Sequence, residues 1–187
     1  MTPRFVIHLL SGGLDSVTLL WKLRHENCQV HCLLFDYLQP HSQELEFAKF
    51  HCRTLNVNST IVHLPNFGGL KDGNWIVPNR NATFLSIAVA MAVNAKSECV
   101  TIGCNADDAA MFPDCRASFI SAMNAAVDAS GLTVEISAPF INMRKREIAG
   151  LAKYYGLPIY ETWSCYIGGD KECGTCPACL QRKEALA

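Results

Sequence analysis

Six residues near the N-terminus, Ser11-Gly12-Gly13-Leu14-Asp15-Ser16, combine glycines with hydroxyl and carboxylate side chains. They follow a short apolar run and precede residues with helical periodicity. Glycines at such a junction let backbone N–H groups point outward, and a helix N-terminus adds partial positive charge, so this loop is suited to hold an anion. Ser11 and Ser16 can add hydroxyl donors, and Asp15 can cap the helix or hold Mg²⁺.

The motif differs from two other glycine-rich phosphate loops. It lacks the GxGxxG pattern of dinucleotide-binding folds and the lysine of GxxxxGK[ST]. A lone Gly-Gly pair could be a tight turn that needs glycine only for its geometry, but the full six-residue string at the first strand–helix junction is much more specific. We therefore predict that nucleotide phosphates bind to Leu10, Ser11, Gly12, Gly13, Leu14, Asp15, Ser16, Val17 and Thr18.

Four of the ten cysteines form a second cluster near the C-terminus, Cys165, Cys173, Cys176 and Cys179. The last three are separated by x2 turns, which suits a tetrahedral zinc–tetrathiolate site. Two disulfides or an iron–sulfur cluster are the alternatives. Four protein ligands would close the site, so its expected role is structural. The other six cysteines are scattered through strand- and helix-like segments, where cysteine behaves as a small apolar residue.

Alternating strand-like and helix-like segments must position these two clusters. Such alternation predicts an α/β fold with a doubly wound parallel sheet. We expect one domain over residues 1–187, with a zinc knuckle in residues 163–182. The expected strands are Arg4–Leu10, Gln29–Phe35, Ser59–Leu64, Cys99–Gly103 and Val134–Ser137, and the expected helices are Asp15–Asn27, Gln43–Leu55, Ala82–Ala95, Pro113–Ser130 and Met143–Tyr155.

Charge and hydropathy narrow the class of partner. The sequence has 16 basic and 17 acidic residues, whereas proteins that grip nucleic acid usually show a basic surplus. The longest apolar stretch, Phe84–Val93, is far shorter than the ~20 residues of a membrane span. Met1–Leu10 lacks a signal-peptide cleavage pattern. We expect a cytoplasmic protein with a small-molecule substrate and without a nucleic-acid or membrane partner.

The loop string resembles the SGGxDS PP-loop of GMP synthetases, asparagine synthetases, NAD synthetases and tRNA thiolases. This resemblance implies a Rossmann-like fold of the adenine nucleotide alpha hydrolase type, and cleavage of ATP between its α- and β-phosphates with the help of Mg²⁺. Activation of a carboxylate as an adenylate supplies a good leaving group, and a loop with Mg²⁺ stabilises the departing pyrophosphate.

Combined with the cysteine cluster, the PP-loop makes the sequence similar to the QueC family over nearly the whole chain. The resemblance implies an ATP-dependent carbon–nitrogen ligase of queuosine biosynthesis, with a homodimer expected. Its implied reaction adenylates 7-carboxy-7-deazaguanine and converts it with ammonia, through the amide, to 7-cyano-7-deazaguanine. Further motifs that carry the resemblance are Tyr37-x-Gln39-x-His41-x2-Glu44, Val77–Asn81, Phe112–Arg116, Lys145, Trp163–Tyr166 and Arg182.

The same resemblance suggests roles for individual residues. Asp114 and Arg116 are expected at the substrate site, and Arg80 is expected to contact substrate or phosphate. Lys145 is either a solvated charge or functional. Together with the PP-loop carboxylate and hydroxyl, these residues form the expected catalytic set: Asp15, Ser16, Arg80, Asp114, Arg116 and Lys145. Three further residues have two readings each, His41 as a surface or functional histidine, and Asp107 and Asp108 as a solvated turn or a site for Mg²⁺ or base recognition.

Three departures from the family pattern surround the expected substrate pocket. Leu38 and Pro40 replace the glycine and arginine of YGQRH, Asn79 replaces the glycine of VPGRN, and the 65–77 loop is shortened. They leave open a QueC-like enzyme that stops at the amide, or that joins the activated deazaguanine to another amine such as a protein N-terminus in phage defence. A zinc-knuckle binding module without catalysis is disfavoured by the intact PP-loop.

Overall fold

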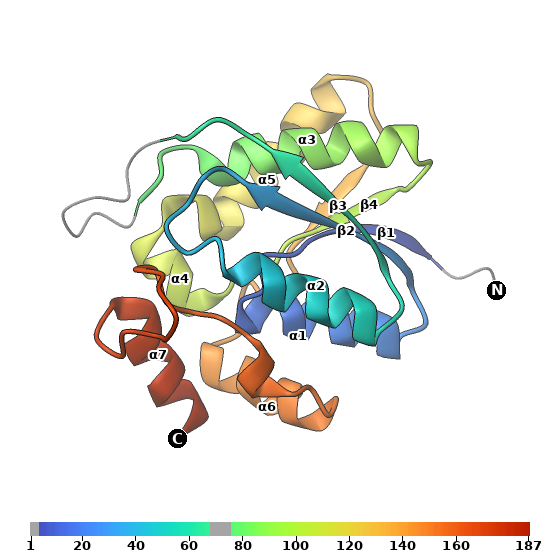
Figure 1. Ribbon diagram of the computed structural model, residues 1–187. Coiled ribbons are helices and arrows are strands. Elements are labelled where there is room, and N and C mark those ends of the chain that lie inside the picture. The colour runs from blue at the N-terminus through green and yellow to red at the C-terminus, as the bar shows by residue number, and fades with distance from the viewer. Residues whose placement is uncertain (1–3, 68–75) are drawn as a thin grey trace.

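In the computed structural model, which describes residues 4–67 and 76–187, five strands form a parallel sheet in the order β3-β2-β1-β4-β5 (Figure 1). Each neighbouring pair of these strands is parallel. The predicted parallel α/β sheet is therefore confirmed. The strands span Phe5–Leu9 (β1), Gln29–Asp36 (β2), Asn58–His63 (β3), Cys99–Thr101 (β4) and Glu135–Ser137 (β5).

Helices cover both faces of the sheet. α1 and α2 lie on one face with α6 and α7 beyond them, whereas α3 and α5 lie on the other face (Figure 1). Among the described residues, no helix has the length and apolar character needed to cross a membrane. The helices span Leu14–His25 (α1), Glu44–Thr54 (α2), Arg80–Asn94 (α3), Ala106–Met111 (α4), Ala117–Ala129 (α5), Lys145–Tyr154 (α6) and Pro177–Leu186 (α7), with 3₁₀ turns at Pro113–Cys115 (η1) and Ile159–Glu161 (η2).

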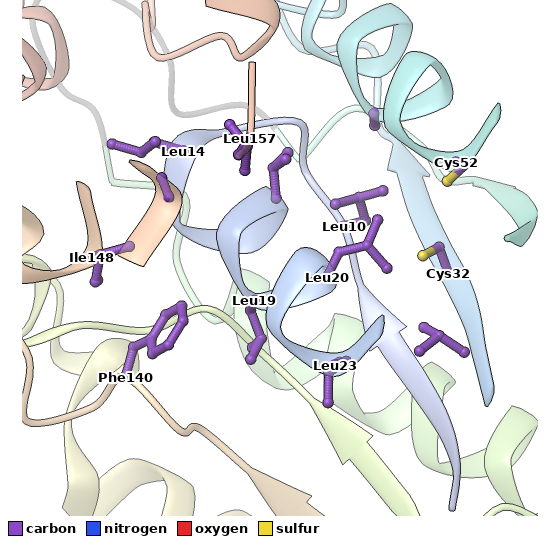
Figure 2. Packing of buried hydrophobic residues seen from close by; sticks show 14 of the residues in the cluster. Leu10, Leu14, Leu19, Leu20, Leu23, Cys32, Cys52, Phe140, Ile148 and Leu157 are labelled. Carbon is purple, nitrogen blue, oxygen red and sulfur yellow. The ribbon is translucent and has the colours of Figure 1, made fainter. Parts of the chain in front are cut away.

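Side chains of β1 alternate between two hydrophobic cores because successive residues of a strand point to opposite faces. Val6 belongs to the core shared with α1 and α6, and Ile7 belongs to the core shared with α3 and α5. Figure 2 shows Leu20 of α1 beside Leu10 and the strands, whereas Leu19 points toward the side of the helix on which Phe140 and Ile148 lie. Burial on two sides fixes the position of α1, and therefore of the PP-loop that leads into it.

The second half of the chain departs from the predicted boundaries. The predicted helix Pro113–Ser130 is instead η1 followed by α5, because Arg116 between them has extended backbone with φ −87° and ψ 153°. The prediction also missed α4 and α7, which are short and carry weak apolar periodicity. α7 begins at Pro177, where the missing N–H of proline costs no helical hydrogen bond.

The connection Pro65–Asn79, which includes the shortened 65–77 loop, leads from β3 to α3. Its glycines Gly68, Gly69 and Gly73 lie outside the described residues. At its described end, Asn79 precedes the first residue of α3 with a left-handed φ of 59°. Asparagine tolerates this backbone region better than most residues, so the turn into α3 keeps its geometry without a glycine.

The strand order determines where a ligand site can lie. The chain winds outward from β1 to β3 and then crosses to β4 and β5, so its direction reverses between β1 and β4. Open α/β sheets bind ligands at the carboxyl ends of the strands at such a reversal. The Ser11–Ser16 loop follows β1 there, and Gly103 follows β4. A Cβ on Gly103 would lie 3.0 Å from Ser16 Cα, so the two loops touch.

Candidate functional site

The PP-loop has the geometry of an anion-binding turn. Gly12 has a left-handed φ of 90° and packs so closely on α2 that a Cβ would lie 2.1 Å from the Glu44 carbonyl oxygen. Gly13 is the residue before α1, and no side chain caps that helix. The N-cap alternative for Asp15 is therefore wrong, since Asp15 lies within the first turn. The first N–H groups of an α-helix have no intrahelical acceptor, so α1 presents donors to the loop.

Two serines and a buried histidine hold this loop in place. Ser16 Oγ lies 3.0 Å from Ser11 Oγ and donates to the Gly13 carbonyl oxygen at 3.2 Å. His8 is fully buried and bridges Thr101 Oγ1 and the Ser16 carbonyl oxygen, each at 2.9 Å. Burial lowers the pKa of His8 to about 4, so the ring is neutral and acts as a structural link between β1, α1 and β4.

Asp15, Asp108 and Lys145 form a charged cluster beside the loop. Lys145 Nζ lies 3.2 Å from Asp15 Oδ2 and 3.6 Å from Asp108 Oδ1, while Asp107 Oδ2 accepts a hydrogen bond from the Lys145 backbone N–H at 2.8 Å. Burial raises the pKa of Asp15 to about 6 although Lys145 lowers it. Oδ1 of Asp15 is buried and has no hydrogen-bond partner among the described residues. An unpartnered buried carboxylate oxygen fits a hard cation such as Mg²⁺.

A second cluster consists of Tyr37, His41, Glu44 and Arg80. Arg80 Nη1 donates to the Tyr37 hydroxyl at 3.0 Å. Gln39 Nε2 donates to Glu44 Oε1 at 3.1 Å, and His41 Nε2 lies 3.6 Å from the same oxygen. Burial raises the pKa of Glu44 to about 7 and lowers that of His41 to about 4. The two side chains are therefore not an ion pair near neutral pH, in spite of their short separation.

Both clusters line one pocket of about 210 Å³ at the carboxyl edge of the sheet. Aromatic side chains stand beside the second cluster. Phe35 and Phe84 stack with ring centroids 4.0 Å apart, and the Tyr37 ring lies 5.6 Å from that of Phe84. The pocket thus joins the PP-loop to a flat, apolar surface that suits an aromatic ring.

The four C-terminal cysteines converge, with their Sγ atoms all within 4.8 Å of one another. They could hold one metal ion. Tetrahedral zinc with bonds of about 2.3 Å would set its sulfurs about 3.8 Å apart, and Cys173 Sγ lies 3.9 Å from Cys179 Sγ. The backbone N–H groups of Thr175 and Cys176 donate to Cys173 Sγ at 3.4 and 3.3 Å, as expected for a thiolate acceptor. This spacing suits a single ion better than a bulkier iron–sulfur cluster.

The cysteine segment packs directly on the PP-loop. The Trp163 backbone N–H donates to the Gly12 carbonyl oxygen at 3.0 Å, and its ring stacks on Phe47 of α2 at 5.7 Å. Arg182 is buried and donates to Thr162 Oγ1 and to the Ile159 carbonyl oxygen, both at 2.7 Å. This tail covers the carboxyl edge of the sheet, and its residues Trp163 and Tyr166 line the pocket.

Comparisons with known proteins agree with this architecture. The sequence matches the family model described as "Queuosine biosynthesis protein QueC" over residues 5–76 and 71–187. It is 40% identical to a protein of Aquifex aeolicus (strain VF5) named 7-cyano-7-deazaguanine synthase, over 97% of this chain and 95% of that protein. The chain belongs to the QueC family. The resemblance predicted from its motifs is thereby confirmed.

Solved structures share the fold at low sequence identity. NMN synthetase from Francisella tularensis matches with a TM-score of 0.59 and 17% identity, over 92% of this chain and 71% of that one. The U34-tRNA thiolase NcsA from Methanococcus maripaludis, solved with its [4Fe-4S] cluster, matches with a TM-score of 0.54 and 16% identity. That match covers the whole of this QueC-family chain but 65% of the thiolase.

The residues expected at the site fall into two groups. Of the residues predicted to bind nucleotide phosphates, six line the pocket together with Arg80, Lys145 and Asp108: Leu10, Ser11, Gly13, Leu14, Asp15 and Ser16. Gly12, Val17 and Thr18 do not line it, and the side chains of Val17 and Thr18 are buried in the fold. Asp114 lies behind it, where Oδ2 accepts from the Asn81 backbone N–H at 3.3 Å. Arg116 is exposed, and its Nε donates to the Ala109 carbonyl oxygen at 3.0 Å. Neither Asp114 nor Arg116 is among the residues that line the pocket, so their expected contact with substrate stays a prediction that this geometry does not favour.

Two residues that depart from the QueC pattern occupy positions where glycine would fit best. Leu38 and Asn79 both have a left-handed φ of 59°. Leu38 lies in a turn in which its N–H donates to Asp36 Oδ1 at 3.1 Å, and it is 67% exposed. The family glycine at position 38 is therefore explained by the backbone, and leucine there is strained.

Replacing Leu38 with glycine should stabilise the protein. A non-glycine residue pays about 1–2 kcal/mol in this backbone region, and the greater freedom of glycine in the unfolded chain offsets part of that gain. We expect the free energy of unfolding in urea to rise by about 1 kcal/mol for Leu38→Gly. Leu38→Ala keeps the strained backbone and should show no such gain. Equal effects of the two variants would mean that the leucine side chain, and not the turn, sets the stability.

Proposed function

We propose that this chain uses ATP to activate 7-carboxy-7-deazaguanine as an adenylate, and converts it with ammonia, through the amide, to 7-cyano-7-deazaguanine. The observation that carries the proposal is a PP-loop with an uncapped helix N-terminus, opening on a pocket that also has an aromatic wall. The names of the QueC-family relatives support the choice of product.

The PP-loop would bind the phosphates of ATP. Backbone N–H groups at the start of α1, with Ser11 and Ser16, can donate to the departing pyrophosphate. Lys145 stands against Asp15, where it can balance both the carboxylate and the phosphate charge. Mg²⁺, if held by Asp15 and Asp108, would supply further positive charge to the pyrophosphate. Ionised Asp15 would keep Lys145 protonated and directed into the pocket.

The Glu44 side of the pocket would receive the organic substrate. Phe35, Tyr37 and Phe84 offer flat surfaces, and the Arg80 guanidinium is a planar donor that suits a carboxylate or a phosphate oxygen. Closure by Trp163 and Tyr166 would exclude water from a reactive adenylate.

We further propose that the metal at the four cysteines is zinc and that its role is structural. All four ligands come from the chain, so no position is open for substrate. Bound zinc would fix residues 163–182 as a knuckle against the PP-loop.

The released nucleotide tests the proposal. With 7-carboxy-7-deazaguanine, ATP, Mg²⁺ and ammonia, the protein should form AMP, pyrophosphate and a product with the mass of the nitrile. Asp15→Asn should reduce AMP formation by about 100-fold or more, because it removes the charge at the loop. Asp128→Asn, on the exposed face of α5, is the matched control and should be fully active.

The pH dependence of AMP formation provides a second test of the proposal. Asp15 must be ionised to hold a cation, and its pKa lies at about 6. At a constant concentration of free NH3, AMP formation should therefore fall as the pH drops through about 6. Release of ADP and orthophosphate would rule out the proposed chemistry. A product with the mass of the amide, or of a conjugate, would keep the activation step and replace the final one.

A further inference from the structure

Glu44 has an unusual environment for a carboxylate that no part of the mechanism above uses. It lines the pocket, and its side chain is 14% exposed. Gln39 fixes one of its oxygens. The Gln39 amide oxygen accepts from the Tyr37 N–H at 2.9 Å, so its Nε2 must be the donor to both the Phe35 carbonyl oxygen and Glu44 Oε1. Among the described residues, Oε2 of Glu44 receives no hydrogen bond.

His41 does not supply the missing donor. Its Nδ1 lies 3.2 Å from the Tyr166 carbonyl oxygen, which can only accept, so Nδ1 carries the ring proton. Nε2 of the neutral ring is then an acceptor, and it faces Glu44 Oε1 at 3.6 Å. The free protein therefore holds a carboxyl group with spare acceptor capacity, directed at a pocket and short of donors.

We propose that Glu44 binds the N1–H and 2-amino edge of the guanine-like ring of the substrate. This inference rests on the proposed function and names the residue that selects the ring. Two adjacent N–H donors match the two oxygens of a carboxylate, and they supply the hydrogen bonds that Glu44 lacks in the free protein.

The position of the aromatic side chains supports this placement. Gln39 joins Glu44 to the end of β2, where Phe35 and Phe84 stack and Tyr37 stands beside them. A planar ring lying on these surfaces would have its polar edge within reach of Glu44. Asp114, which was expected at the substrate site, instead accepts a hydrogen bond from the Asn81 backbone N–H at the start of α3 and does not line the pocket.

The adenine of ATP is a poorer partner for this carboxylate. Its amino group is a donor, but the neighbouring N1 is an acceptor and would face the second carboxylate oxygen. An acceptor opposite an ionised oxygen costs affinity, whereas the guanine edge offers a donor at both places. Glu44 should therefore favour the deazaguanine over adenine.

Isothermal titration can test the assignment. The ligands are 7-carboxy-7-deazaguanine, its analogue without the 2-amino group, and ATP with Mg²⁺; the proteins are the wild type, Glu44→Gln and Glu46→Gln. Glu46→Gln is the matched control, because it makes the same change on the exposed face of α2. Glu44→Gln should weaken binding of the deazaguanine acid by about 100-fold and abolish the preference for the 2-amino group. Its affinity for ATP should stay within about twofold of the wild type, as should all affinities of Glu46→Gln.

The outcomes separate this inference from the proposed function. If the wild type forms AMP from the acid but Glu44→Gln binds the acid normally, the role of Glu44 is wrong and the function stands. If the wild type binds the acid with the expected preference and forms no AMP, the function is wrong and the role stands. Loss of ATP affinity in Glu44→Gln would overturn the assignment, and failure of the wild type to bind the acid would overturn both.

Urea unfolding at two pH values tests whether Glu44 lacks hydrogen bonds in the free protein. Burial raises the pKa of Glu44 to about 7 even though Gln39 and Arg80 lower it, and the other groups facing it are neutral His41 and Tyr37. A folded-state pKa above the unfolded value means that stability is lost as the pH rises through about 7. Glu44→Gln should therefore raise the urea midpoint at about pH 8.5 and change it far less at about pH 4.5. A lower midpoint in the variant at the higher pH would show that Glu44 is already satisfied in the free protein.

Discussion

Gly12→Ala should abolish ATP turnover and destabilise the protein. A Cβ on Gly12 would lie 2.1 Å from the Glu44 carbonyl oxygen and 3.1 Å from the Ala48 backbone nitrogen. Both atoms belong to the backbone of α2, so no side-chain rotation can relieve the clash. The residue also has φ 90°, where alanine is strained.

The clash must move either the PP-loop or α2, and each movement has a cost. Displacing the loop would break the hydrogen bond from the Trp163 N–H to the Gly12 carbonyl oxygen and shift the N-terminus of α1. We expect a loss of about 3 kcal/mol in the free energy of unfolding. AMP formation should fall by at least about 100-fold, because donors that are misplaced by an ångström no longer stabilise the departing pyrophosphate.

Gly150→Ala is the matched control for this substitution. Gly150 lies within α6, and a Cβ there would meet no atom within 4 Å. Alanine at this position should stabilise the helix by up to about 1 kcal/mol and leave turnover unchanged. Urea denaturation and AMP release, measured on both variants, would test whether only Gly12→Ala lowers stability and turnover. A Gly12→Ala protein with normal turnover would mean that the PP-loop has room that this structure does not show.

Removal of the metal from the cysteine site should unfold residues 163–182 and inactivate the protein. Structural zinc sites contribute about 10–16 kcal/mol of apparent binding free energy, and this energy is available only to the folded segment. Without the metal, four thiols within 4.8 Å of one another offer little to hold the knuckle together. Trp163 would then leave both the Gly12 carbonyl oxygen and Phe47, and the pocket would lose one wall.

Metal analysis and hydrogen exchange can test this expectation without an activity assay. We expect one zinc per chain, its loss in Cys176→Ser, and fast exchange of the Trp163 and Cys173–Cys179 amides in that variant. Cys28→Ser is the matched control, since Cys28 is a buried cysteine that immediately precedes β2 and lies outside the cluster. It should keep its zinc and the slow exchange of the tail. Iron in place of zinc, or a tail that stays protected after chelation, would contradict the proposed structural zinc site.

The two chemical motifs could be recognised from sequence because each is contiguous or nearly so. Within the PP-loop string, glycine positions and the strand–helix junction specify the backbone on their own. Within the cysteine cluster, spacing alone brings the thiolates together. The parallel sheet could also be predicted, because alternating apolar segments leave few other ways to bury both faces.

Which residues line the pocket depends on the tertiary structure. Lys145 meets Asp15 across 130 positions in the chain, because α6 packs beside α1. Arg116 belongs to a motif typical of the family, yet it is the extended residue between η1 and α5 and lies exposed at the surface. No local pattern encodes either outcome, since both depend on how distant helices pack.

Glu44 shows the same limit most clearly. In sequence it belongs to the Tyr37-x-Gln39-x-His41-x2-Glu44 motif but was given no role, because an acidic residue at the start of an amphipathic helix is ordinarily solvated. In the structure, close packing of Gly12 against its carbonyl oxygen brings the start of α2 to the pocket, and Gln39 and neutral His41 enclose its side chain. The sequence determined the residue types available for chemistry, and long-range packing determined which of them face the ligand, because burial and the supply of hydrogen-bond donors are properties of the assembled fold.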